Sequence, residues 1–177
     1  MTEPNVQPEP EDRDWTYVLA QGCGDCGFDP EFDRTEIPAR IRAAASAFGT
    51  VLAAPGASDR PAPTVWSPVE YACHVRDVCT IMNTRAQLML TQHDPQFQNW
   101  DQDATAIEER YWEQSPATVA TALATAAEVA AATYAGVAAD SWERPGRRSN
   151  GSVFTVDSLG RYFLHDLEHH VWDVTSD

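Results

Sequence analysis

Basic residues are scarce in this sequence. Of its 177 residues, 12 are Lys or Arg and 27 are Asp or Glu, so the net charge at pH 7 is −15. A charge of this sign repels phosphate backbones and anionic membrane surfaces, and we expect neither nucleic-acid binding nor membrane binding. The same electrostatic field favours the capture of a divalent cation.

Long apolar runs are absent too. No window approaches the roughly 20 apolar residues that a membrane-spanning helix needs. The first 14 residues are rich in Pro, Glu and Asp, and they have neither the basic start nor the apolar centre of a signal peptide. We therefore predict a loosely attached N-terminal arm over residues 1–14, a single helical-bundle domain over residues 15–177, and a cytoplasmic location.

Cysteine is rare, with four residues in the chain. In a cytoplasmic protein, so few cysteines favour free thiols or metal ligands over a disulfide framework. Cys23 and Cys26 enclose a short turn like half of a zinc ribbon, but a structural zinc site needs a second ligand pair. Cys73 and Cys79 cannot complete it, because in a helix they lie roughly 120° out of phase. We interpret the Cys23–Cys26 turn as structural or incidental.

Helical periodicity dominates the rest of the chain. The clearest helix start is Ser67, which is followed by Pro68 and, at the third helical position, Glu70. The stretch over residues 140–151 is predicted to be a loop or tight hairpin, and convincing alternation for a sheet is absent. We therefore predict an all-α four-helix bundle with long irregular connections. Its long helices are predicted over residues 36–54, 68–92, 115–139 and 155 or 158 to 174, with a short one over residues 105–112.

The last predicted helix carries a dense group of metal-binding side chains. Residues four apart rise from one face of a helix, so it can supply two ligands to one ion. The apolar residues of this helix place Asp166 and His170 nearer the core than His165 and His169. We therefore favour Asp166 with His170 and keep His165 with His169 as the alternative pair.

A third ligand can come from the helix that begins after Ser67, where His74 falls in the apolar stripe and points inward. Each inward histidine could instead be a hydrogen-bonded core residue. A buried carboxylate beside two imidazoles, however, needs a compensating partner. This argument predicts a cation at His74, Asp166 and His170.

Other polar residues are candidates for supporting roles. Asp173 or Glu168 could orient a ligand imidazole from behind. Arg85 is nearly in phase with His74 three turns later and is a candidate for binding an acidic part of a cofactor. Arg147 and Arg148 are further candidates, although surface solvation explains all three arginines equally well.

These motifs resemble a known family. The Trp-Ser-Pro start of the His74 helix, the Phe-Gln-Asn-Trp-Asp segment at residues 97–101 and the C-terminal His-His-x-x-Asp are similar to the DinB-like superfamily of metal-binding four-helix bundles. This superfamily includes mycothiol-dependent maleylpyruvate isomerases and the bacillithiol and mycothiol S-transferases. The resemblance covers about residues 36–174. It implies a metal held by His74, Asp166 and His170, although Asp166 departs from the family's usual His or Glu.

The residues and the resemblance together predict a divalent-metal-binding bundle. Zinc is the leading ion, with nickel or another divalent metal as the alternative. Three protein ligands leave a position open for a thiolate or water, so we predict a thiol-dependent S-transferase or isomerase that uses a low-molecular-weight thiol such as mycothiol on a small electrophile. The alternative is a non-catalytic metal-binding stress-response or interaction bundle. The alanine-rich helix over residues 115–139 would allow close packing, so a homodimer is a further hypothesis.

Overall fold

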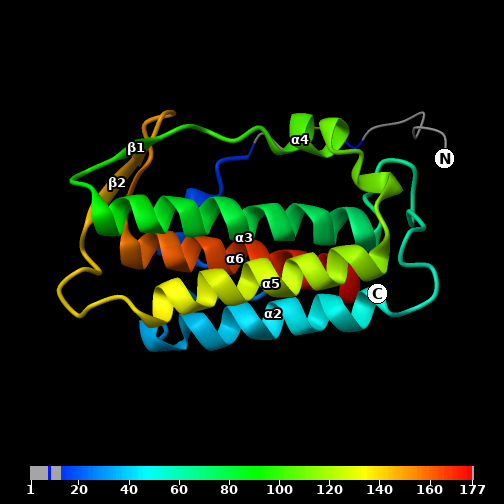
Figure 1. Cartoon of the computed structure of the whole chain (residues 1–177), viewed down its shortest axis with the longest axis horizontal. Coiled ribbons are helices and arrows are strands. Elements are labelled where there is room, and N and C mark those ends of the chain that lie inside the picture. Colours follow the sequence, from blue (N-terminus) through cyan, green and yellow to red (C-terminus); the bar gives the residue numbers. More distant parts are fainter. Residues whose placement is uncertain (1–7, 9–12, 177) are drawn as a thin grey trace.

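A computed structural model describes residue 8 and residues 13–176, so the predicted arm over residues 1–14 lies largely outside the described residues. Four long helices form the bundle (Figure 1): α2 (Ile37–Leu52), α3 (Pro68–Thr91), α5 (Pro116–Ala135) and α6 (Val156–Thr175). Helices α5 and α6 each pack against both α2 and α3. The prediction of a four-helix bundle is confirmed. None of the helices in this described part combines the length and the apolar character that crossing a bilayer requires.

A small three-stranded sheet at one end of the bundle departs from the prediction. β1 (Gln96–Phe97) runs parallel to β2 (Pro145–Arg148), and β2 pairs in antiparallel fashion with β3 (Val153–Thr155). Strands of two to four residues are too short to produce a readable alternation of apolar and polar residues. The sheet ties the α3–α5 connection to the hairpin that precedes α6.

The α3–α5 connection contains two short helices instead of the predicted single one over residues 105–112. These are α4 (Gln102–Glu108) and the 3-10 helix η3 (Tyr111–Glu113), separated at Arg110, whose φ is 50°. Just before α4, the indole Nε1 of Trp100 donates a hydrogen bond of 2.7 Å to Thr105 Oγ1. The connection therefore holds the Trp100 ring in a defined position beside α3.

The start of α3 is held by a buried polar network. Ser67 and Glu70 form the predicted capping box, and Glu70 is 1% exposed. Arg60 donates two hydrogen bonds to the Glu70 carboxylate, at 2.9 and 2.5 Å. Because Glu70 lies about one turn before His74, this network fixes where His74 enters the core.

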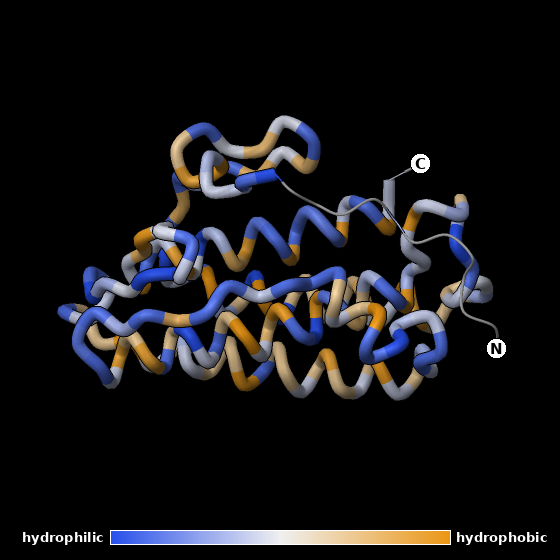
Figure 2. Tube along the Cα trace, turned by 90° about the horizontal axis from the view of Figure 1, so that it is seen from above, coloured by the Kyte–Doolittle hydropathy of each residue, from blue (hydrophilic) through white to orange (hydrophobic). Residues whose placement is uncertain are grey.

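The N-terminal segment, defined here as residues 13–36, forms a layer beside the helix that ends at the C-terminus (Figure 2). It contains η1 (Trp15–Tyr17), α1 (Val18–Gln21) and η2 (Arg34–Glu36). Arg161 of α6 donates hydrogen bonds to the carbonyl oxygens of Pro30 and Phe32. This layer covers a face of α6 that the helix alone would leave to solvent.

The prediction that Asp166 lies nearer the core than His165 is wrong, because the covering layer buries His165. His165 is 3% exposed, whereas the side chain of Asp166 is 22% exposed. A helical wheel ranks positions by the apolar residues of one helix. It could not include a contact made by a segment more than a hundred residues away.

Candidate metal centre

Three predicted ligands converge where α3 meets α6. One ligand atom from each of His74, Asp166 and His170 lies within 4.8 Å of the other two. The Nε2 atoms of His74 and His170 lie 3.4 and 3.7 Å from Asp166 Oδ1. The two imidazole rings are perpendicular, with centroids 4.8 Å apart. These distances approach the ~3.4 Å that separates donors in a tetrahedral site with bonds of ~2.1 Å.

His74 is buried without hydrogen bonds. It is 1% exposed, and neither ring nitrogen has a hydrogen-bond partner among the described residues. The rings of Trp66 and Trp100 pack against it, with centroids 5.6 and 5.4 Å away. Burial lowers the pKa of His74, and the nearby Asp166 only partly opposes this shift. The imidazole is therefore neutral near pH 7, and a bound cation would satisfy a nitrogen whose burial is otherwise costly.

Asp166 supplies the negative charge of the group. Burial acts to raise the pKa of this carboxyl, but His74 and then His170 and His165 outweigh it, so the net shift of the pKa is downward. Asp166 Oδ1 has no hydrogen-bond partner among the described residues. One carboxylate beside two imidazoles is a donor set that suits zinc and similar divalent ions.

Of the two carboxylates predicted to have a supporting role, Asp173 is the one that contacts an imidazole of the group. Its Oδ2 lies 2.8 Å from His170 Nδ1. This contact favours a proton on Nδ1 and turns the lone pair of Nε2 toward Asp166 and His74. Glu168, the other predicted carboxylate, instead accepts two hydrogen bonds of 2.7 Å from Arg40. It links α6 to α2 and is not placed to orient a ligand.

Replacing Asp173 with asparagine is expected to weaken metal binding at this centre by about 10- to 100-fold, because the amide no longer selects the correct His170 tautomer. Competition with a chromophoric chelator measures the affinity. Asp140→Asn, at an exposed position outside the centre, is the matched control. Equal affinities for the two variants would argue against an orienting role for Asp173.

Two cavities reach the group. The larger, about 490 Å³, extends to Asp166, and the smaller, about 280 Å³, extends to His170 and Asp173. No fourth His, Cys, Asp or Glu joins the group in the part of the chain that the structure describes. Three protein donors with open space beside them are typical of catalytic metal sites, whereas structural sites are closed.

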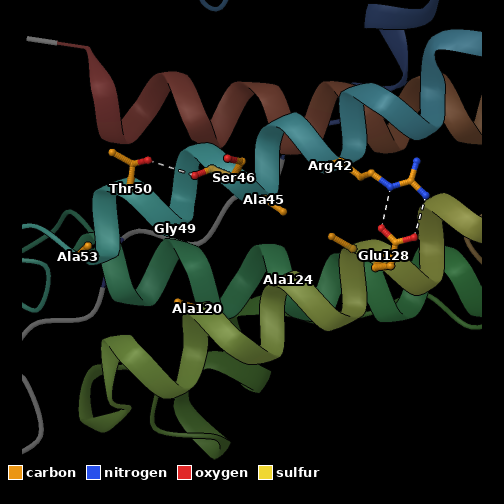
Figure 3. Close-up of a pocket in the computed structure, with 10 residues that line it drawn as sticks. Arg42, Ala45, Ser46, Gly49, Thr50, Ala53, Ala120, Ala124 and Glu128 are labelled. Carbon is orange, nitrogen blue, oxygen red and sulfur yellow. Dashed lines mark hydrogen bonds and ion pairs between the residues drawn. The ribbon is translucent and has the colours of Figure 1, made fainter.

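Another hollow lies away from this group, between α2 and α5 (Figure 3). It measures about 730 Å³ and is lined by small residues together with Arg42 and Glu128, which form an ion pair. It contains no imidazole or thiol. Part of this groove is the alanine-rich face of α5, and dimerisation through that face stays a prediction.

Arg85 is not placed at the metal centre. It is 6% exposed, and its Nη2 donates a hydrogen bond of 3.0 Å to the carbonyl oxygen of Gln98. Burial, together with the nearby Arg148, lowers the pKa of Arg85 to about 10. Its side chain lines neither cavity. Arg85 therefore anchors the segment around β1, and the predicted cofactor-binding role is not supported by its position.

Several residues around the centre were missed or only half identified from the sequence. Of the two hairpin arginines, Arg147 forms an ion pair with Asp94 and Arg148 lines the larger cavity. The sequence did not predict that Trp66 and Trp100 cover His74. The position of Trp66, directly before the Ser-Pro start of α3, is the local signal for such a role, because an aromatic residue next to a helix cap can form the wall of a site.

The alternative ligand pair belongs to a different group. His165 and His169 do not replace Asp166 and His170 beside His74. They lie together with Cys23 and Cys26 in a second set of metal-binding side chains.

The four-helix fold and the group of three donors between α3 and α6 together indicate the class of metal-binding helical bundles. The DinB superfamily matches residues 40–174, and the chain belongs to this superfamily. The structure of YfiT from Bacillus subtilis, described as a probable metal-dependent hydrolase with an unusual four-helix bundle topology, is similar. The TM-score is 0.64 at 19% sequence identity, over 80% of this chain and 79% of YfiT. This likeness supports the fold. Comparison with curated proteins gives no match.

Proposed function

We propose that the protein is a divalent-metal-dependent enzyme that transfers a low-molecular-weight thiol to a small electrophile. The observation that carries this proposal is the open centre, where three donors converge and two cavities reach them. When bound, a zinc-like ion would act as a Lewis acid and lower the pKa of a thiol or water molecule at the open position.

The residues around the centre have complementary tasks in this proposal. In this proposal, His74 and His170 present ring nitrogens to the ion, and Asp166 offsets part of its charge. Trp66 and Trp100 pack on His74 and exclude water from that side. A drier environment strengthens every electrostatic interaction at the centre.

The larger cavity supports a hydroxyl-rich thiol as the first substrate. Amide and carboxylate side chains exchange hydrogen bonds readily with hydroxyl groups. Arg148 adds a cationic group on the same wall. A thiol carried on a sugar, such as mycothiol, matches this lining. The amide and carboxylate residues of the wall include Asn99, Asp101, Gln102, Asp103 and Asn150.

The smaller cavity supports an electrophile as the second substrate. Its wall includes Val65, Trp66 and Tyr71 next to His170. Burial, followed by the charges of Asp173 and Glu70, raises the pKa of Tyr71 to about 12. The phenol therefore stays protonated and can donate a hydrogen bond to negative charge that develops on the electrophile.

Replacing Tyr71 with phenylalanine is expected to lower kcat by about 10- to 100-fold while metal content stays unchanged, since one donor to the transition state is lost. Steady-state rates of the metal-loaded protein measure this effect. Tyr17→Phe, outside both cavities, is the control. An unchanged kcat would remove Tyr71 from the proposed machinery.

Hydrolysis is the second candidate, because water could take the position proposed for the thiol and YfiT is described as a probable metal-dependent hydrolase. Metal-loaded protein should be assayed for consumption of mycothiol with a panel of electrophiles, and separately for cleavage of ester and amide substrates without thiol. Thiol consumption that requires the metal supports transfer, whereas turnover without thiol supports hydrolysis. Bound metal with neither activity would favour the non-catalytic alternative.

A further inference from the structure

A second donor group lies beside the proposed active site, and one of its members, His169, also lines the smaller cavity. One ligand atom from each of Cys23, Cys26, His165 and His169 lies within 4.8 Å of the other three, and Cys23 Sγ is 3.6 Å from His169 Nδ1. In a tetrahedral zinc site with Zn–S bonds of about 2.3 Å and Zn–N bonds of about 2.05 Å, the donors lie ~3.4–3.8 Å apart. Movements of about an ångström would therefore close the group on one ion.

The backbone turns tightly around the two cysteines. The N–H of Gly27 donates to the carbonyl of Cys23 at 3.0 Å, and the N–H of Cys23 donates to the carbonyl of Phe28 at 2.9 Å. Gly22 and Gly27 have φ values of 70° and 75°, and a Cβ on Gly22 would lie 2.6 Å from the Phe28 carbonyl oxygen. This Cys-x-x-Cys-Gly turn brings both thiols to the same group, as half of a zinc site requires.

The two histidines complete the group from α6. His165 is 3% exposed, and its Nε2 has no hydrogen-bond partner among the described residues. His169 lies one helical turn later, with Nδ1 toward Cys23. Trp15 packs on both imidazoles, and Phe28 packs edge-on against His165. A buried nitrogen without a partner is costly, and a cation in the group would supply that partner.

We propose that Cys23, Cys26, His165 and His169 bind a zinc ion in a closed tetrahedral site that fastens the N-terminal segment to α6. Two thiolates and two imidazoles are a donor set typical of structural zinc. Because all four positions are filled by protein, this ion has no open position and performs no chemistry of its own. The proposal does not depend on the thiol chemistry proposed for the other centre.

Residues that pack on the second group also form walls of the open centre. Trp15, which packs on His165 and His169, lines both cavities at the open centre, and Asp14 lines the larger one. Asp173 lies between the two groups, since its Oδ2 is 2.8 Å from His170 Nδ1 and its Oδ1 is 3.9 Å from His169 Nε2. The two i, i+4 pairs of α6 are offset by one residue, or about 100° around the helix. One helix thus serves a structural ion and a catalytic ion on adjacent faces.

Metal content of the full-length protein tests the proposal directly. After zinc saturation and dialysis, we expect about two zinc ions in the wild type, about one in Cys26→Ser, about one in His74→Ala and none in the double variant. Cys26 is only partly buried, so its replacement leaves the core intact. Circular dichroism checks that the helices remain. A wild type that binds a single zinc, lost in His74→Ala and kept in Cys26→Ser, would overturn the proposal.

Cobalt substitution identifies the donors. Thiolate-to-cobalt charge-transfer absorption should appear in the wild type and in His74→Ala, and it should be lost in Cys26→Ser. Cys73→Ala, which removes a buried thiol outside the group, should keep the band. A band that persists in Cys26→Ser counts against the site. So does a Cys23–Cys26 disulfide, detected by mass in protein purified without reductant.

Limited proteolysis tests the fastening role. Cleavage within residues 13–36 should accelerate in Cys26→Ser and stay at the wild-type rate in zinc-loaded His74→Ala, because only the first variant loses the closed site. Equal cleavage of both variants would contradict a role in holding the N-terminal segment. Failure to find thiol transfer would overturn the proposed function and leave these results unaffected.

Discussion

Replacement of His74 by alanine is expected to remove the ion from the open centre and to lower metal-dependent turnover at least about 100-fold. His74 is the ligand that α3 contributes, and α6 alone offers two donors with no bridge to a second helix. Metal analysis after dialysis measures the loss of the ion. Steady-state rates with thiol and electrophile measure the loss of turnover. The loss of metal and the loss of turnover should occur together.

The same variant should lose the stabilisation that the ion provides. A ligand that binds only the native state stabilises it by about 2.7 kcal/mol when its free concentration is 100 times its Kd. Thermal melts with and without zinc should therefore show a smaller zinc-induced shift for His74→Ala than for the wild type. His93→Ala, at an exposed position outside both donor groups, is the control. Wild-type affinity in the His74 variant would contradict the proposed ligand set.

Replacement of Glu70 by alanine is expected to lower the free energy of unfolding by about 3–5 kcal/mol, which is the usual cost of breaking a buried ion pair. Glu70 is 1% exposed and the side chain of Arg60 is 12% exposed, so solvent compensates little for the lost carboxylate. The substitution also deprives the backbone N–H and hydroxyl of Ser67 of their acceptor at the start of α3.

Urea unfolding in the presence of a chelator measures this effect without any contribution from bound metal. Glu128→Ala is the matched control, because Glu128 also pairs with an arginine, Arg42, but the two side chains are 60% and 45% exposed. An exposed pair of this kind contributes less than about 1 kcal/mol. Similar destabilisation by the two substitutions would show that burial of the Arg60–Glu70 pair has no special importance.

The long helices could be predicted because their signals are local. The capping sequence after Trp66 predicted the start of α3 at Pro68, and apolar periodicity predicted the extents of the other long helices to within a few residues. The sheet was missed because β1 pairs with β2 across about fifty residues of chain, and such short strands carry no periodic pattern of their own. The helix predicted over residues 105–112 was misplaced at both ends. Asp101 caps α4 so that it begins at Gln102, and the left-handed backbone conformation of Arg110 ends the helical stretch early.

For the open centre, helical spacing and family resemblance selected His74, Asp166 and His170, and the structure brings these three side chains together. The directions of Glu168 and Arg85 could not be predicted, since each depends on a partner from another element. Glu168 turns to Arg40 on α2, and Arg85 turns to the carbonyl of Gln98. Spacing along one helix indicates which face a residue occupies, but not which neighbour it meets there.

The amino-acid sequence by itself determined the bundle and the residues able to chelate an ion, because helix periodicity, capping and i, i+4 spacing act over a few residues. Only the tertiary structure decided how the α6 histidines are divided between two donor groups. Cys23 and His169 are 146 positions apart, and no local pattern links them. The contact exists because the N-terminal segment packs over α6, and burial by a distant segment is a property of the whole fold.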